Sequence, residues 1–380
     1  SIGFTNGKPV GSASPLTWAQ ATVARLTIDL GAGRSVETPG IVSDRYVAHG
    51  MPGALPVKIT SPAPGATITT QSITVTGTTT PHALVDAEAD TSAGGAAASA
   101  STTADGSGHW SLSLTPATFG SPTITVTATK GNSTGYAQES VSDATLPGTA
   151  VLTAADPSGD DNGPGTYQYP TAADFVAGSF DITNFQVNET ATDVYIQTTL
   201  RTLVPTFGEN FGAQLLDVFV HNPSASPSST AAPFSTRNYS IAPAGAWTER
   251  IEAQGFAPPV WVNAANASLG SAQIFTDLTT RTATLVLPRA AFGDPVSGWV
   301  FTVALTGQDG FSSDQARTFA PTPQPFNFGV CAAGNTAAIC GVDPNTVAKV
   351  MDTVTPPGVD QGTELNRAQG PVALQGVSVP

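Results

Sequence analysis

Three aspartates lie close together in one short segment of the chain, at Asp156, Asp160 and Asp161. The segment is rich in glycine and proline, which exclude a helix interior or a central strand and predict a loop. Carboxylates gathered in a glycine-bent loop suit a hard cation such as calcium, which takes about six to eight oxygen ligands. Asp160 and Asp161 are the better candidate ligands, with Asp156 and the later Asp181 as further ones. The alternative is a solvated acidic turn without a metal, and the spacing does not match an EF-hand loop.

The chain has two cysteines, Cys331 and Cys340, a short way apart in the sequence. Their spacing excludes a Cys-x-x-Cys redox motif. A zinc site needs further ligands nearby, and the four histidines are scattered along the chain. The pair favours a disulfide that closes a short loop, which fits an exported protein. Two buried free thiols are the alternative.

Aromatic residues in the last part of the chain could bind a carbohydrate, because exposed rings with a polar rim can hold the flat apolar faces of sugars. Trp261 is the first candidate, because the approach to it through Pro258 and Pro259 is typical of an exposed loop. Trp247 leads into a strand and is expected to be at least half buried, and Tyr169 is the third candidate. The alternative for each ring is a place in the core of a β-sandwich.

Composition limits the classes of partner. The 380 residues include 28 acidic and 14 basic ones, which gives a net charge of -14. Such a surface does not favour nucleic acid or anionic membranes as partners. No stretch is long and apolar enough to insert into a membrane. The length is sufficient for two or three domains with cores of their own.

Apolar residues that alternate with threonine or serine predict β-strands along much of the chain. Between residues 57 and 145 the runs are short and regularly separated by turn signals, which indicates a small β-sandwich. In the later part, residues 179–187 and 193–200 predict a hairpin. Further strands are predicted over 214–220, 272–275, 283–287 and 299–305. Asp343 followed by Pro344 predicts a short helix over residues 343–351.

Residues 14–27 predict a helix near the start of the chain. Ser14 can cap it, Pro15 suits its first turn, and Leu16, Val23 and Leu26 follow at helical spacing. One amphipathic helix cannot bury its own apolar face, so we expect it to belong to a larger unit upstream. Ser1 begins without the charged region of a signal peptide, which predicts a fragment or a processed product.

Many stretches of the chain resemble the bacterial glucodextranases, a glucoamylase-like family of inverting glycoside hydrolases. The matching stretches are residues 3–7, 41–46, 61–65, 106–110, 156–165, 178–182, 247–251, 307–311, 316–317, 351–356 and 361–365. The resemblance implies a mainly β fold of two consecutive β-sandwich domains, preceded by the last helix of an (α/α)6 barrel. Residues 1–50 would be the tail of that catalytic barrel. Residues 57–145 would form an immunoglobulin-like β-sandwich, and residues 150–380 the glucodextranase C-terminal β-sandwich module. The resemblance also favours calcium at the aspartate loop.

The resemblance further implies a region without catalytic residues. Inverting glycosidases place two carboxyl groups across the scissile bond, and in this family both lie upstream of the last barrel helix. The first acidic residue here is Asp29, beyond the core of the predicted helix. No catalytic residue is therefore assigned, and the isolated chain is not expected to be an enzyme.

Three functions remain open on the sequence. In the first, the chain is an accessory region of a bacterial, secreted or cell-surface glucodextranase-like exo-glucohydrolase of α-glucans such as dextran, with its α-1,6 linkages. It would dock on the upstream catalytic barrel and bind polysaccharide or the cell surface. In the second, it is one piece of a processed hydrolase that is active only with its missing N-terminal part. In the third, it is a structural surface-attachment module, which the helix at residues 14–27 argues against.

Overall fold

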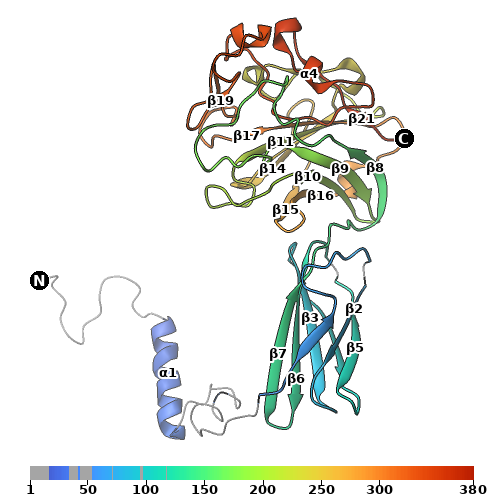
Figure 1. The fold of residues 1–380 in the computed structure, drawn as a ribbon, viewed down its shortest axis with the longest axis vertical. Coiled ribbons are helices and arrows are strands. Elements are labelled where there is room, and N and C mark those ends of the chain that lie inside the picture. The colour runs from blue at the N-terminus through green and yellow to red at the C-terminus, as the bar shows by residue number, and fades with distance from the viewer. Residues whose placement is uncertain (1–16, 34–41, 43–53, 71, 95–96, 117) are drawn as a thin grey trace, which may run out of the picture.

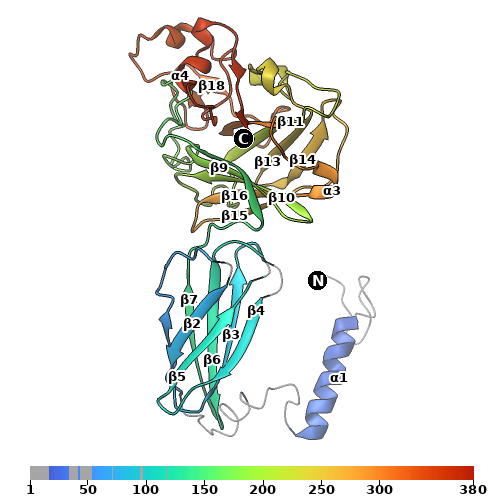
Figure 2. The same cartoon turned by 90° about the vertical axis from the view of Figure 1, so that its right-hand side faces the viewer.

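The computed structural model describes residues 17–33, 42, 54–70, 72–94, 97–116 and 118–380. Within them the predicted helix is α1 (Thr17–Ala32), which stands apart from the sheets in Figures 1 and 2. Its side chains Val23, Leu26 and Leu30 are exposed. Ser14 and Pro15, together with residues 3–7 and most of 41–46, lie outside the described part. No helix in that part has both the length and the hydropathy needed to cross a membrane.

A first β-sandwich follows α1, as the alternating pattern predicts. A three-stranded sheet, β1-β2-β5, faces a four-stranded sheet, β4-β3-β6-β7. Trp110 lies in its core opposite Gly77, where an added Cβ would come within 2.1 Å of the indole ring, so only glycine fits. The strands are β1 (Lys58–Ser61), β2 (Ile73–Thr78), β3 (Leu84–Thr91), β4 (Ala98–Thr103), β5 (His109–Leu114), β6 (Pro122–Lys130) and β7 (Ser133–Ser140).

A second, larger sandwich has a core of its own, with Phe185 and Phe301 at its centre. One sheet has the order β15-β16-β10-β9-β8 and the other the order β14-β13-β11-β17-β21. The predicted hairpin is present as the antiparallel pair β9 and β10. The long strands are β8 (Thr149–Ala155), β9 (Ile182–Glu189), β10 (Asp193–Leu200), β11 (Gln214–His221), β13 (Glu249–Gln254), β14 (Ala257–Asn263), β15 (Gln273–Asp277), β16 (Thr282–Pro288) and β17 (Val300–Gly307).

Residues 338–378, here called the C-terminal layer, help to cover the outer face of the β11 sheet, where Phe219, Trp247, Leu365 and Leu374 form a second apolar cluster. Seven of the eight residues of β11 are therefore buried, which explains its nearly continuous apolar sequence. The short elements are η2 (Ser235–Arg237), β12 (Ser240–Ile241), η3 (Pro243–Gly245), α3 (Arg289–Phe292), β18 (Phe319–Ala320), β19 (Phe328–Gly329), η4 (Ala338–Gly341), α4 (Gln361–Glu364), η5 (Arg367–Gln369), β20 (Ala373–Leu374) and β21 (Val377–Ser378).

The helix expected over residues 343–351 is wrong. Asp343 does cap the segment, because its side chain accepts from Asn345 N at 3.0 Å and its carbonyl from Thr346 N at 2.9 Å. The chain then leaves the turn in an extended conformation, with Lys349 N donating to Arg237 O at 2.9 Å and Met351 N to Leu305 O at 2.8 Å. Contacts with the rest of the module replace the local helical hydrogen bonds.

The two sandwiches meet at Asp277, the last residue of β15. Its Oδ2 accepts from Ser92 Oγ at 2.9 Å and from Ser121 N at 2.6 Å, both in the first sandwich. Beside it, Phe119 packs edge-on against Tyr195 and Phe275, with ring centroids 5.4 and 5.6 Å apart. The joint therefore combines a buried carboxylate with an aromatic contact.

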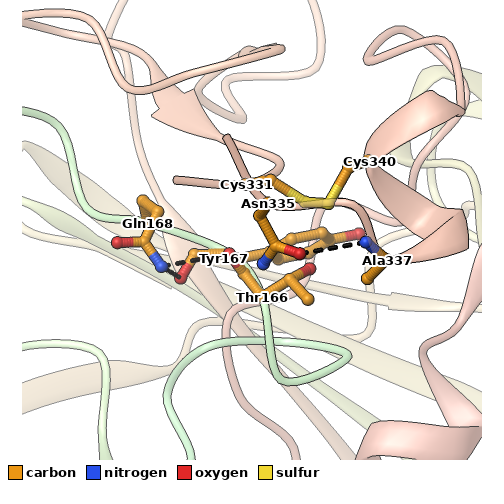
Figure 3. Close-up of a disulfide and its surroundings, with 7 residues drawn as sticks. All are labelled: Thr166, Tyr167, Gln168, Cys331, Asn335, Ala337 and Cys340. Carbon is orange, nitrogen blue, oxygen red and sulfur yellow. Dashed lines mark hydrogen bonds between the residues drawn. A yellow bond between two sulfur atoms is a disulfide. The ribbon is translucent and has the colours of Figure 1, made fainter. Parts of the chain in front are cut away.

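The predicted disulfide between Cys331 and Cys340 is present. Figure 3 shows it close to Tyr167, which belongs to the same core cluster as Cys331. The disulfide closes a short loop, and within this loop Asn335 Oδ1 accepts a hydrogen bond from Ala337 N at 3.0 Å.

Replacing both cysteines, as Cys331→Ala with Cys340→Ala, is expected to lower the free energy of unfolding by about 2.5 to 3 kcal/mol, because the cross-link restricts a short loop in the unfolded chain. Urea unfolding followed by tryptophan fluorescence measures the difference. The wild-type protein under reducing conditions should show the same loss. Identical unfolding midpoints for the variant and the oxidised protein would contradict this expectation.

Candidate metal-binding site

Three aspartates from distant parts of the second sandwich form one cluster. Asp156 directly follows β8, Asp160 lies in the loop after it, and Asp352 belongs to the C-terminal layer. One carboxylate oxygen from each lies within 4.8 Å of the other two. The sequence predicted Asp156 and Asp160 as ligands but missed Asp352, which is remote from them in the chain. The only signal was its place in residues 351–356, one of the family-like stretches.

Backbone hydrogen bonds hold the aspartate loop in place. Gly163 N donates to Met351 O at 2.8 Å, and the side chain of Gln361 donates to Asp160 O at 2.6 Å. Gly163 has a φ of +56°, and a Cβ there would come within 2.2 Å of the Tyr167 ring. The loop is therefore fastened to the C-terminal layer on the side from which Asp352 approaches.

The cluster is electrostatically unfavourable without a cation. Burial, together with the charges of Asp160 and Asp181, raises the pKa of Asp156 to about 8. Burial and the charges of Asp181 and Asp161 raise the pKa of Asp160 to about 6. Burial, with Asp156 and Asp160 nearby, also raises the pKa of Asp352 well above its usual range. Burial of the carboxylates and repulsion between their like charges together account for all three raised pKa values.

Several oxygens in the cluster are available to a metal. Asp156 Oδ2 and Asp160 Oδ1 are buried and have no hydrogen-bond partner within the described part of the chain. Asp352 is held by Ile182 N, which donates to its Oδ2 at 2.6 Å, and by Thr353 N at 2.9 Å. A set of oxygen ligands without histidine or cysteine fits a hard cation, and calcium tolerates its irregular geometry better than magnesium does.

The other two predicted ligands make protein contacts. Asp161 accepts a hydrogen bond from the hydroxyl of Tyr169. Asp181 Oδ2 accepts from Gly159 N at 2.8 Å and from Arg201 at 3.4 Å. Asp181 Oδ1 is also buried without a partner among the described residues. These two residues are not part of the three-aspartate cluster, although their charges act on Asp160. The metal assignment itself stays a prediction.

Two of the three aromatic residues predicted to bind sugar are buried inside the protein. Trp261 is only 2% exposed, and its indole nitrogen donates to Glu249 Oε2 at 2.9 Å. The expected exposure of Trp261 is therefore wrong. Its two preceding prolines belong to β14, an edge strand, where the missing N–H groups of proline are tolerated. Burial raises the pKa of Glu249 to about 7.

Trp247 and Tyr169 are also structural. Trp247 is 3% exposed, in agreement with the expectation that it is at least half buried, and its indole nitrogen donates to Ala231 O at 2.8 Å. Tyr169 packs edge-on against Phe180 and Phe328, with ring centroids 5.2 and 6.4 Å away. Trp261 and Trp247 are thus buried, and Tyr169 is partly buried.

Comparison with known protein families gives one match. Residues 151–375 match the model of the C-terminal binding module, SLH-like, of glucodextranase. The matched region runs from β8 to β20 and contains all three aspartates of the cluster. A search of curated proteins finds no match.

Solved structures resemble the chain only weakly. A tetra-tandem repeat from the extending region of a large adhesion protein is 16% identical, with 68% of this chain and 45% of that chain covered and a TM-score of 0.22. Escherichia coli alpha-2-macroglobulin activated by porcine elastase is 12% identical, with 69% and 21% covered and a TM-score of 0.24. The chain thus spans less than half the length of either structure.

Proposed function

Because the chain belongs to the family of C-terminal, SLH-like binding modules of glucodextranase, we propose that it is the carbohydrate-binding, non-catalytic region of a secreted glucodextranase-like hydrolase of α-glucans. The family match carries this proposal, since it spans both sheets of the second sandwich and most of the C-terminal layer. Dextran, with its α-1,6 linkages, is the proposed polymer. The module would keep the catalytic domain close to this polymer.

The N-terminal part is proposed to be the tail of a catalytic (α/α)6 barrel. Support comes from α1, whose exposed Val23, Leu26, Ile28 and Leu30 need a further apolar surface to cover them. On this proposal the two catalytic carboxyl groups lie upstream in the barrel. The disulfide supports an exported protein, located outside the cell or on its surface.

Calcium is proposed to occupy the cluster of Asp156, Asp160 and Asp352. When bound, it would neutralise carboxylates that otherwise repel one another. Its role would be structural, because the three ligands join the end of β8 to the C-terminal layer.

The full chain is expected to migrate more slowly in native gels that contain dextran than in gels without polymer, and to release no glucose from dextran or starch. Affinity electrophoresis and a glucose assay measure the two properties, with serum albumin as a non-binding reference. Starch-containing gels test the preference between linkages. Equal mobility in the presence and absence of both polymers would refute carbohydrate binding. Glucose release by the pure chain would refute its non-catalytic nature.

A further inference from the structure

A cleft of about 740 Å³ opens at one end of the second sandwich, and none of its lining residues belongs to the aspartate cluster. Its aromatic residues come from four separate loops and turns: Phe207, Phe256, Phe311 and Phe326. They are between 42% and 86% exposed, and Phe311 is the most exposed of them. Four open phenylalanine rings around one concave surface are unusual for a free protein surface and mark a binding site.

The cleft has a fixed aromatic base. The buried Phe175 lies under it, with the rings of Phe207 and Phe326 edge-on at centroid distances of 5.8 and 6.3 Å. The guanidinium carbon of Arg317 lies 4.7 Å from the Phe175 centroid. Phe207 and Phe326 are therefore packed from beneath while they remain partly open to solvent.

The polar groups of the cleft suit a neutral ligand. Gln308 and Arg317 line it and are more than nine-tenths buried. Gln308 Oε1 and Arg317 Nε have no hydrogen-bond partner among the residues that the structure describes. Carbonyl oxygens of Phe326 and Gln308 already accept from the two terminal nitrogens of Arg317, at 2.6 and 2.7 Å. Two of the five N–H groups of Arg317 are thereby used, and the carboxylate of Asp309 lies in the same lining, which offsets the positive charge and favours a neutral ligand whose hydroxyl groups both donate and accept.

The loop that carries Phe311 is held in place through hydrogen bonds to Asp314. Asp314 Oδ2 accepts from Lys349 Nζ at 2.8 Å and from Thr236 Oγ1 at 2.5 Å. Burial alone would raise the pKa of Asp314, but the hydrogen bonds from Lys349 and Thr236 lower it to about 2. The carboxylate therefore stays ionised, and the loop is held before a ligand arrives, which reduces the entropy lost on binding.

We propose that this cleft is the carbohydrate site of the module and takes a short segment of a neutral α-glucan chain, a proposal that rests on the carbohydrate-binding function proposed above. The phenylalanine faces contact the C–H faces of the sugar rings, because the negative face of an aromatic ring attracts the positive edge of a C–H group. Sugar hydroxyls bind the partly exposed polar residues of the lining, Ser312, Gln315 and Asn327, directly or through a bridging water.

Titration of the full chain with an α-1,6-linked gluco-oligosaccharide, followed by calorimetry or saturation-transfer NMR, tests the proposal. Phe311→Ala is expected to raise the dissociation constant about 3- to 10-fold, the loss of one aromatic contact. Phe311→Tyr should bind like the wild type. Phe311→Leu, which keeps an apolar side chain without a ring, should bind as poorly as the alanine variant. Tyr136→Ala is the matched control, because Tyr136 is 76% exposed on the first sandwich.

The outcomes distinguish the proposal that the cleft is the sugar site from the more general proposal that the module binds carbohydrate. If the wild type binds the sugar and all three Phe311 variants bind equally well, the cleft is not the site, although the module still binds carbohydrate. If Phe311→Leu binds as tightly as the wild type, stacking on a sugar is wrong. If the wild type binds no sugar, both proposals fail. Thermal melting of each variant verifies that folding is unchanged.

Discussion

Removing calcium with a chelator is expected to lower the free energy of unfolding by about 3 to 4 kcal/mol, the stabilisation that a ligand gives at roughly 100 to 1,000 times its dissociation constant. Asp156, Asp160 and Asp352 hold together parts of the chain that are far apart in sequence. Without the cation, their like charges favour separation. Thermal and urea unfolding with calcium and with chelator measure the change, and metal analysis of the native protein gives the stoichiometry.

Two variants make the calcium experiment specific. Asp156→Asn removes a carboxylate whose Oδ2 has no hydrogen-bond partner among the described residues, so it should abolish most of the calcium effect without breaking another contact. Asp174→Asn removes an exposed carboxylate from a nearby loop and should keep the full effect. An unchanged melting temperature with chelator, together with no stoichiometric calcium, would leave the cluster as an acidic pocket without a metal.

The metal-free protein should also respond to pH in a defined direction. The folded-state pKa values of Asp156 and Asp160, about 8 and about 6, lie above the usual value of 3.8. Raised carboxyl pKa values mean that deprotonation costs stability as the pH rises through this interval. In chelator, the wild type should therefore gain stability relative to Asp156→Asn when the pH falls from about 8 to about 5. With calcium bound, protons compete with the metal for the carboxylates. The stability of the wild type relative to Asp156→Asn should then fall as the pH is lowered.

Replacing Arg237 with methionine is expected to lower the free energy of unfolding by about 3 to 5 kcal/mol, because the buried carboxylates of Asp217 and Glu252 would then share a single cation, Arg250, whose Nη1 lies 3.4 and 3.2 Å from them. Arg237 is fully buried, and its terminal nitrogens donate to Asp217 Oδ2 at 2.6 Å and to Glu252 Oε2 at 3.0 Å. Its Nε also donates to Asp314 O at 3.0 Å. Asp217 and Glu252 lie directly opposite each other on β11 and β13, so they would repel each other across the strands.

Chemical unfolding of the Arg237→Met variant measures this loss. Arg289→Met is the matched control, because Arg289 is partly exposed and pairs with the exposed Asp294 at 2.6 Å and with the partly exposed Glu189 at 3.3 Å. A surface pair of this kind contributes about 0 to 1 kcal/mol. Equal effects of the two substitutions would show that the Arg237 cluster does not stabilise the module. Because Arg237 also contacts the loop of Phe311 through Asp314, the variant should weaken sugar binding as well.

Strand positions were the most predictable part of the molecule. The alternation around Trp110 and Ile124 and the hairpin of β9 and β10 are present where the pattern indicated. Alternation is a local property that one buried sheet face imposes on every strand, so it can be read without knowing the fold. The helix predicted over 343–351 is absent for the opposite reason, because beyond the turn at Asp343 the backbone N–H groups of Lys349 and Met351 bond to Arg237 and Leu305 rather than within the segment.

The candidate sites were less predictable. Exposure of Trp261 could not be judged from its prolines, because the edge position of β14 lets a proline-containing strand pack its tryptophan inward. The sequence did not predict the aromatic cleft, because no local pattern distinguishes its four phenylalanines, Phe207, Phe256, Phe311 and Phe326. Only the meeting of four separate loops and turns gives them a common surface.

By itself, the sequence determined the mainly β character, the disulfide partners and the presence of an acidic loop. Each of these follows from residue types over a short stretch. The tertiary structure alone decided which aspartates meet, which aromatic rings are buried and where a cleft opens. Asp352 reaches Asp156 only because the C-terminal layer folds back over the sandwich. Contacts between distant segments depend on how the sheets pack, and a linear pattern does not contain that information.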